Sequence, residues 1–268
     1  MLVEVARSTI PVGMTVGTIL VFAVAKICSG GASDTNPSNT IGASEADKSQ
    51  CPSIANESRY AASVVVEGAN GAIAVDSSGL YYAVSVGEDD HRSWRIRQRQ
   101  LDGIEVNVVG PQKADIWQLA VDEKNVYFGQ GRSLMRVNKK TRAITVLAPL
   151  SGYLGHLAVD TSAVYWSEDK DIYALPHGTK KPKKLATTSD TILSFLVHSA
   201  RVYWLNRKSI SPYQVASVSY AGGAAETTVA PDEYYGGVDG IGFDDTYMYW
   251  NEGKGFFASC FKAEALRG

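Results

Sequence analysis

Residues 157–166 read LAVDTSAVYW, and four other stretches of the chain repeat this pattern without a gap. Each copy has three apolar or small residues, an Asp or His, three turn residues, an apolar residue and two aromatics. The aromatics that end successive copies are 46, 38, 38 and 46 residues apart. Five copies in register indicate an internal repeat, which is typical of propellers and solenoids. The other copies are residues 73–82, 119–128, 195–204 and 241–250.

Each copy predicts a tight pair of strands. An apolar strand ends in an Asp, whose side chain can accept hydrogen bonds from backbone N–H groups two or three residues on. His198 takes the place of this Asp in the fourth copy. In the second strand, two successive aromatics point to opposite faces of the sheet. Because Trp166, Trp204 and Trp250 recur at one repeat position, we expect them to fill the core rather than to bind a ligand.

Two more strands follow most copies. Alternating stretches predict third strands at 95–101, 134–138, 172–175, 214–220 and 256–262, and fourth strands at 106–109, 144–148, 184–188 and 227–230. Four short strands in each repeat of about 40–45 residues are the signature of a propeller blade. The sequence therefore predicts an all-β fold, a β-propeller of five four-stranded blades.

The fifth copy has no fourth strand, whereas an unpaired strand, residues 63–67, precedes the first copy. Pairing this N-terminal strand with the last blade would close the ring and remove two open sheet edges. Cys51 precedes that strand and Cys260 lies in the last blade, so a disulfide between them would staple the closure. Its entropic gain could reach ~4–5 kcal/mol. The alternative is a buried Cys260 and an exposed Cys51 without a bond.

The N-terminal segment indicates export. Residues 8–25 carry no charge and lie between Arg7 and Lys26, as in the apolar region of a signal peptide. The stretch is also just long enough to span a bilayer. Cys28 precedes Ser-Gly-Gly, as at a bacterial lipoprotein start, so secretion, lipidation at Cys28 and an uncleaved anchor all stay open. We expect a signal or anchor at 1–27, a flexible linker at 28–58 and the propeller at 59–268, outside the cytoplasm.

Composition excludes some classes of function. The chain has 268 residues, of which 45% are hydrophobic and 20% charged, with a net charge of −2. Because nucleic-acid-binding domains usually carry a basic excess, we expect no nucleic-acid partner. The three cysteines form no CxxC motif, so we expect no metal site of the zinc type and no cofactor. We expect a monomer that meets the membrane only through its N-terminal segment.

The repeats resemble the YWTD-type propellers of low-density-lipoprotein receptors and their secreted bacterial relatives. The residues that carry the resemblance are Tyr165-Trp166-Ser167-Glu168, Tyr203-Trp204-Leu205-Asn206 and Tyr249-Trp250-Asn251-Glu252, each after a strand like Leu-Ala-Val-Asp. The resemblance covers about residues 60–262. It implies a propeller and an extracytoplasmic location, and it implies no particular ligand.

Candidate ligand-binding residues lie in the loops that join one blade to the next, since loops on a rigid scaffold usually carry function. Exposed aromatics there could stack on sugar or peptide faces, and we interpret the chain as a non-catalytic module that binds a glycan, a peptide or an envelope protein. We assign no catalytic residues. The candidate binding residues are Trp117, Tyr153, His156, Asp190, Tyr234, Tyr235 and Asp239.

Two other functions stay open. A lactonase- or glycosidase-like hydrolase would need carboxylates that converge at the channel mouth, and the candidates are Asp115, Glu168, Asp190, Asp239 and Glu252. A scaffold that only assembles with envelope proteins would expose a large apolar patch. The acidic run Glu88-Asp89-Asp90 could hold calcium, but three consecutive acids cannot all face one ion, so we interpret it as a solvated loop.

Overall fold

A computed structural model describes residues 66, 69, 72–87, 92–207, 214–229, 241–243, 247–253 and 259–265. At 207, 229, 247, 249–253 and 259–265 the backbone alone is described. The described residues form strands, turns and irregular segments, and no helix occurs among them. They therefore contain no helix long and apolar enough to cross a membrane.

The described strands form five antiparallel sheets, which we call blades 1 to 5 in chain order. In each blade the strands are neighbours in sequence order, so every blade is a simple meander. Blades 1 and 2 are β1 (Ile73–Asp76), β2 (Gly79–Val86), β3 (Ser93–Gln100), β4 (Glu105–Gln112), and β5 (Leu119–Val121), β6 (Asn125–Gln130), β7 (Ser133–Asn138), β8 (Ile144–Pro149).

Blades 3 and 4 have the same four-stranded form, whereas blade 5 has three described strands. Blade 3 is β9 (Leu154–Val159), β10 (Ala163–Glu168), β11 (Asp171–Pro176) and β12 (Lys183–Thr187). Blade 4 is β13 (Thr191–His198), β14 (Arg201–Arg207), β15 (Gln214–Ser219) and β16 (Glu226–Val229). Blade 5 is β17 (Ile241–Phe243), β18 (Tyr247–Gly253) and β19 (Ser259–Ala265).

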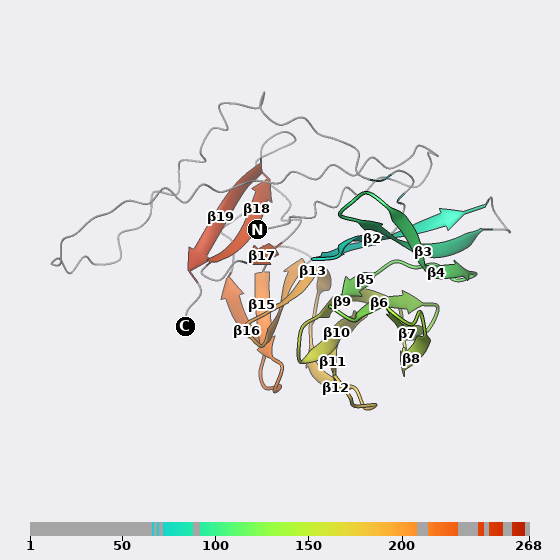
Figure 1. Cartoon of the computed structure of the whole chain (residues 1–268). Coiled ribbons are helices and arrows are strands. Elements are labelled where there is room, and N and C mark those ends of the chain that lie inside the picture. The colour runs from blue at the N-terminus through green and yellow to red at the C-terminus, as the bar shows by residue number, and fades with distance from the viewer. Residues whose placement is uncertain are drawn as a thin grey trace, which may run out of the picture.

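The first strands of the blades meet at the centre of the molecule. Strand β1 contacts β5, β5 contacts β9, β9 contacts β13, and β13 contacts β17. Figure 1 shows the sheets arranged around these inner strands, with the later strands of each blade farther out. This arrangement confirms the prediction of an all-β propeller. Of the predicted closing strand only Val66 is described, so the closure and the number of blades stay predictions.

The hydrophobic core lies between adjacent blades. Alternate residues of a strand point to opposite faces, and the two aromatics of each repeat follow this rule. Tyr165 packs towards blade 4, in the same cluster as Trp204, whereas Trp166 packs towards blade 2, in the same cluster as Tyr127. All four side chains are fully buried. Trp166 and Trp204 therefore fill the space between blades, as the repeat predicts.

The Asp turns form as expected, with one additional bond. Asp160 Oδ1 accepts hydrogen bonds from the backbone N–H groups of Ser162 at 2.7 Å and Ala163 at 3.0 Å. Asp122 makes the equivalent bonds, and its Oδ2 also accepts one from the Tyr127 hydroxyl at 2.6 Å. In blades 2 and 3 the spacing of Asp and Tyr thus allows a side-chain bond that ties the turn to the second strand, whereas in blade 1 the Tyr81 hydroxyl bonds Ser78 instead.

Candidate binding face and cleft

A meander of four strands places its connections on two opposite faces. The loops between blades share one face with the turns between second and third strands, and we call this the loop face. Its described segments are 113–118, 131–132, 150–153, 169–170 and 188–190. The Asp turns and the hairpins between third and fourth strands lie on the other face, the turn face, which includes segments 101–104 and 220–225.

Trp117 is an exposed aromatic on the loop face, in the loop between β4 and β5. Its side chain is 59% exposed, whereas its neighbour Ile116 is fully buried and anchors the loop in the core. The Trp117 ring lies against Trp94 of β3, with centroids 5.5 Å apart and planes tilted by 53°. Trp94 is itself buried, so it holds the exposed ring in place from below.

Tyr153 is the second exposed aromatic of the loop face, in the loop between β8 and β9. Its side chain is 83% exposed. The preceding residue, Gly152, lies close to the Asp169 carboxylate of the β10–β11 turn, where a Cβ atom would come within 2.8 Å of Oδ2. A side chain at position 152 would push the end of the Asp169 side chain aside, so the two segments pack closely at the start of the loop that presents Tyr153.

His156 and Asp190 lie deeper than the two exposed rings. His156 is half-buried in β9, and its Nε2 lies 3.0 Å from the Ile192 carbonyl oxygen of β13. A carbonyl oxygen only accepts, so Nε2 carries the hydrogen of this bond. The ring also stacks on Phe195. Asp190, at the loop between β12 and β13, accepts a hydrogen bond from the Ser189 hydroxyl at 2.6 Å.

Glu168 is buried at the end of β10 and holds the loop between β8 and β9. Its Oε2 accepts bonds from the Ser151 N–H at 2.8 Å, the Ser151 hydroxyl at 2.6 Å and the Gly152 N–H at 3.2 Å. Its Oε1 accepts the indole N–H of Trp166 at 2.8 Å. Burial alone would raise the pKa of Glu168, but these four donors outweigh it and lower the pKa below its ordinary value. Oε2 thus holds the loop, and Oε1 holds the indole of Trp166.

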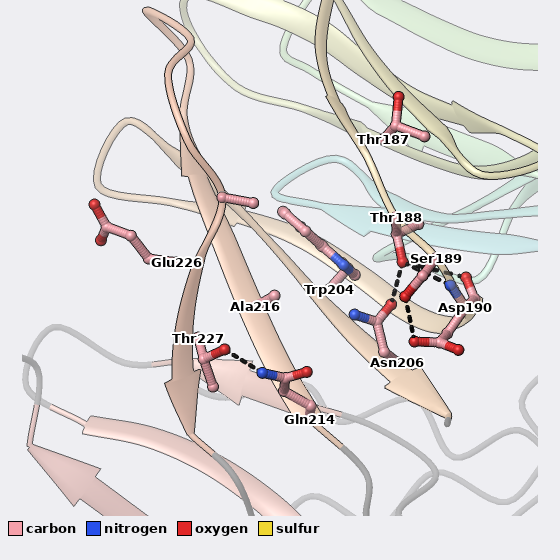
Figure 2. A pocket seen from close by; sticks show the side chains of 11 residues that line it. Thr187, Thr188, Ser189, Asp190, Trp204, Asn206, Gln214, Ala216, Glu226 and Thr227 are labelled. Atoms are coloured by element: carbon pink, nitrogen blue, oxygen red, sulfur yellow. Dashed lines mark hydrogen bonds between the residues drawn. The ribbon is translucent and has the colours of Figure 1, made fainter. Parts of the chain in front are cut away.

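Blade 4 has a small cleft near Asn206, the residue that corresponds to Glu168. The cleft lies between the β12–β13 loop and strands β14 to β16 (Figure 2). Its volume is about 180 Å³. Most side chains that line it are polar, and Thr188 and Asn206 are buried there and joined by a hydrogen bond of 3.0 Å. The lining includes Thr188, Ser189, Asp190, Trp204, Asn206 and Gln214.

The structure brings only some of the candidate residues into view. Trp117 and Tyr153 lie exposed on the loop face, Asp190 lines the cleft, and His156 lies between inner strands. Tyr234, Tyr235, Asp239, Cys28 and Cys51 lie outside the described residues, and Cys260 is described only as backbone in β19. In the described part of the chain no group of three His, Cys, Asp or Glu side chains could hold a metal ion, and the run Glu88-Asp89-Asp90 lies outside it.

Sequence reasoning missed the cleft, although the repeats contain a signal for it. Glu168 follows Trp166 by two residues, and Glu252 follows Trp250 in the same way. Asn206 stands at this place after Trp204 and breaks the pattern. Val84 and Gln130 stand there in the first two repeats, so among the three repeats that end in Tyr-Trp only the fourth lacks a glutamate, and this difference marks blade 4.

Comparison with known proteins assigns no family. No protein-family model matches the chain, and no curated protein matches it in sequence. Three solved structures are similar: the computationally designed Ika4 protein (TM-score 0.47, 13% identity, 58% of this chain and 94% of that one), a nidogen–laminin complex (0.48, 13%, 60% and 66%) and TolB from Acinetobacter baumannii (0.46, 15%, 67% and 50%). At these scores the likenesses carry no argument about function.

Proposed function

We propose that the chain is a non-catalytic binding module that takes a glycan, peptide or protein ligand on its loop face. The observation that carries this proposal is the pair of exposed rings, Trp117 and Tyr153, in consecutive inter-blade loops. Large aromatic rings that are held in place contribute strongly to binding, because they offer a wide contact area at a low cost in conformational entropy. Trp94 under Trp117 supplies this support, and the hydrogen bonds that Glu168 accepts from Ser151 and Gly152 hold the loop just before Tyr153.

The carboxylates of the hydrolase alternative offer less support for that function. Glu168 is buried, and its Oε2 holds a loop while its Oε1 accepts the indole N–H of Trp166, so both oxygens already serve structural hydrogen bonds. Asp115 is exposed on the β4–β5 loop, and Asp190 lies in the blade 4 cleft. A glycosidase needs two carboxylates on either side of one bond, and these three acids lie in three different surroundings.

The loop face is tested by binding the purified chain to arrays of immobilised glycans and peptides. Trp117→Ala and Tyr153→Ala each remove an exposed ring, so we expect each to weaken binding to any ligand found by about tenfold or more. Tyr220→Ala is the matched control, because Tyr220 is 46% exposed but lies on the turn face. Equal binding by the parent and both loop-face variants would contradict the proposal.

The location of the module is part of the same proposal. An apolar N-terminal stretch followed by a linker fits a protein held outside the cytoplasm as a monomer, either secreted or anchored through its N-terminus. The intact mass of the protein recovered from its native host tests this. We expect a mass that lacks the first ~25 residues, a mass that carries a lipid on Cys28, or a full-length mass in the membrane fraction. A full-length, unmodified mass in the soluble cell fraction would contradict it.

A further inference from the structure

Blades 3 and 4 align residue by residue at an offset of 38, and the alignment shows what the blade 4 cleft is missing. Trp204 corresponds to Trp166, Ser189 to Ser151, Asp190 to Gly152 and Asn206 to Glu168. In blade 3 the Glu168 carboxylate accepts the indole N–H of its tryptophan and bonds the adjacent loop. In blade 4 no carboxylate stands at that position.

Among the described residues, the indole N–H of Trp204 has no acceptor. Trp204 is 1% exposed, and its Nε1 finds no hydrogen-bond partner within the described part of the chain, although the side chain lines the cleft. The oxygen of Asn206 accepts the Thr188 hydroxyl at 3.0 Å and does not accept the indole N–H. Figure 2 shows Trp204 and Asn206 among the side chains that line the cleft, with the hydrogen bond from Thr188 to Asn206. A buried, unpaired donor is costly unless something that enters the site supplies the acceptor.

The residues that line the cleft indicate the chemical class of the ligand that would supply this acceptor. The indole of Trp204 donates, whereas the Asp190 carboxylate accepts, so a ligand group that both accepts and donates satisfies both walls. Hydroxyl groups do this. A carboxylate or phosphate would instead face the negative charge of Asp190, and the nearby Glu226 is already paired with Arg201 at 2.8 Å.

We propose that the blade 4 cleft is a binding site for a neutral polyhydroxyl group, such as one sugar ring, in which a ligand hydroxyl takes the place that Glu168 fills in blade 3. The volume of about 180 Å³ lies below the 300–1,000 Å³ of sites for drug-sized molecules, which fits a single ring. This site goes beyond the proposed function, because it needs neither Trp117 nor Tyr153.

The test follows the indole N–H signals of the ¹⁵N-tryptophan-labelled full chain by NMR. Glucose, galactose, mannose and N-acetylglucosamine are the probes, and acetate is the anionic comparison. We expect at least one sugar to shift the Trp204 signal in a saturable way, with a Kd on the order of 1 mM for a ligand of about a dozen heavy atoms. The Trp166 signal is the internal control, since Glu168 already accepts its N–H.

A designed variant removes the site without removing the tryptophan. Asp190→Gly together with Asn206→Glu copies the blade 3 arrangement, so the new carboxylate should accept the Trp204 N–H and fill the cleft. We expect this variant to keep its fold, to move the Trp204 signal before any sugar is added, and to lose the sugar-dependent shift. Leu101→Ala, a change on the turn face, should leave the titration unaltered.

Three results would overturn the proposal. No saturable shift with any of the sugars would mean that an ordered water alone satisfies Trp204. A shift with acetate and not with sugars would mean that the site prefers anionic ligands. An unchanged sugar shift in the Asp190→Gly, Asn206→Glu variant would place the ligand elsewhere. The array experiment reads other residues, so either proposal can fail alone.

Discussion

At the scale of single residues, Glu168 shows how a carboxylate in a repeat can be structural rather than catalytic. Four donors from Ser151, Gly152 and Trp166 hold it in a buried position. Hydrogen bonds to a charged group contribute about 1.5–3 kcal/mol each when the partner is lost from a buried site. Glu168→Gln replaces one of the two acceptor oxygens with an NH₂ group, which cannot accept a hydrogen bond from these donors. We therefore expect the free energy of unfolding to fall by about 2 kcal/mol at neutral pH.

The pH dependence of this loss follows from the lowered pKa of Glu168. A carboxyl group whose pKa is lower in the folded than in the unfolded protein stabilises the fold at pH values above its unfolded pKa, here about 4.5. This contribution is lost as the pH falls through the folded pKa. The difference between parent and Glu168→Gln in urea unfolding should therefore shrink below about pH 4.5. Glu123→Gln is the control, because Glu123 is exposed in the β5–β6 turn and should show no difference at any pH.

At the scale of single elements, the turn between β13 and β14 departs from the other repeats. His198 has no carboxylate to accept the backbone N–H groups that Asp122 and Asp160 bind in their turns. The backbone instead places Ser199 at φ 46° and Ala200 at φ 59°, a left-handed pair typical of two-residue hairpin turns. His198 stacks on Phe243 of blade 5, with centroids 5.0 Å apart, so the change of residue serves a contact between blades.

Two non-glycine residues in the left-handed region should leave stability to be gained in this turn. Each costs about 1–2 kcal/mol of backbone strain. A glycine avoids this strain but loses more conformational entropy on folding, so only part of the strain energy is gained as stability. Ser199→Asn with Ala200→Gly supplies the favoured residues, and we expect a gain of about 1 kcal/mol in chemical unfolding. Ser162→Gly, at a position of the Asp160 turn without a positive φ, should destabilise instead. A loss in the first variant would refute this account of the turn.

At the scale of the whole molecule, the repeat predicted the fold because a propeller depends on local pattern. Each blade is four neighbouring strands, and alternation of apolar side chains is enough to place Tyr165 and Trp166 on opposite faces. The cleft could not be predicted in the same way. It lies between the β12–β13 loop and strands β14 to β16, and its lining, with the unpaired indole N–H of Trp204, becomes visible only when these segments are placed against one another.

The closure of the ring is the remaining property of the whole molecule, and it yields the last prediction. Val66 and Ala69 pack with Leu80, Tyr82 and Val84, on the face of blade 1 that points away from blade 2. Chain just before β1 therefore covers the free side of the first blade. A strand that continues from there to complete blade 5 would carry Cys51 towards Cys260.

We expect Cys51 and Cys260 to form a disulfide in the exported protein. Because the loop they close spans most of the chain, its reduction should lower the free energy of unfolding by up to about 4 kcal/mol. The measurement is the unfolding midpoint with and without reductant, for the parent, Cys260→Ala and the control Cys28→Ala. Cys260→Ala should remove the effect of reductant, whereas Cys28→Ala should preserve it. Alkylation of both Cys51 and Cys260 without prior reduction would show that both are free thiols and would contradict the disulfide. Closure of the ring would then rest on strand pairing alone.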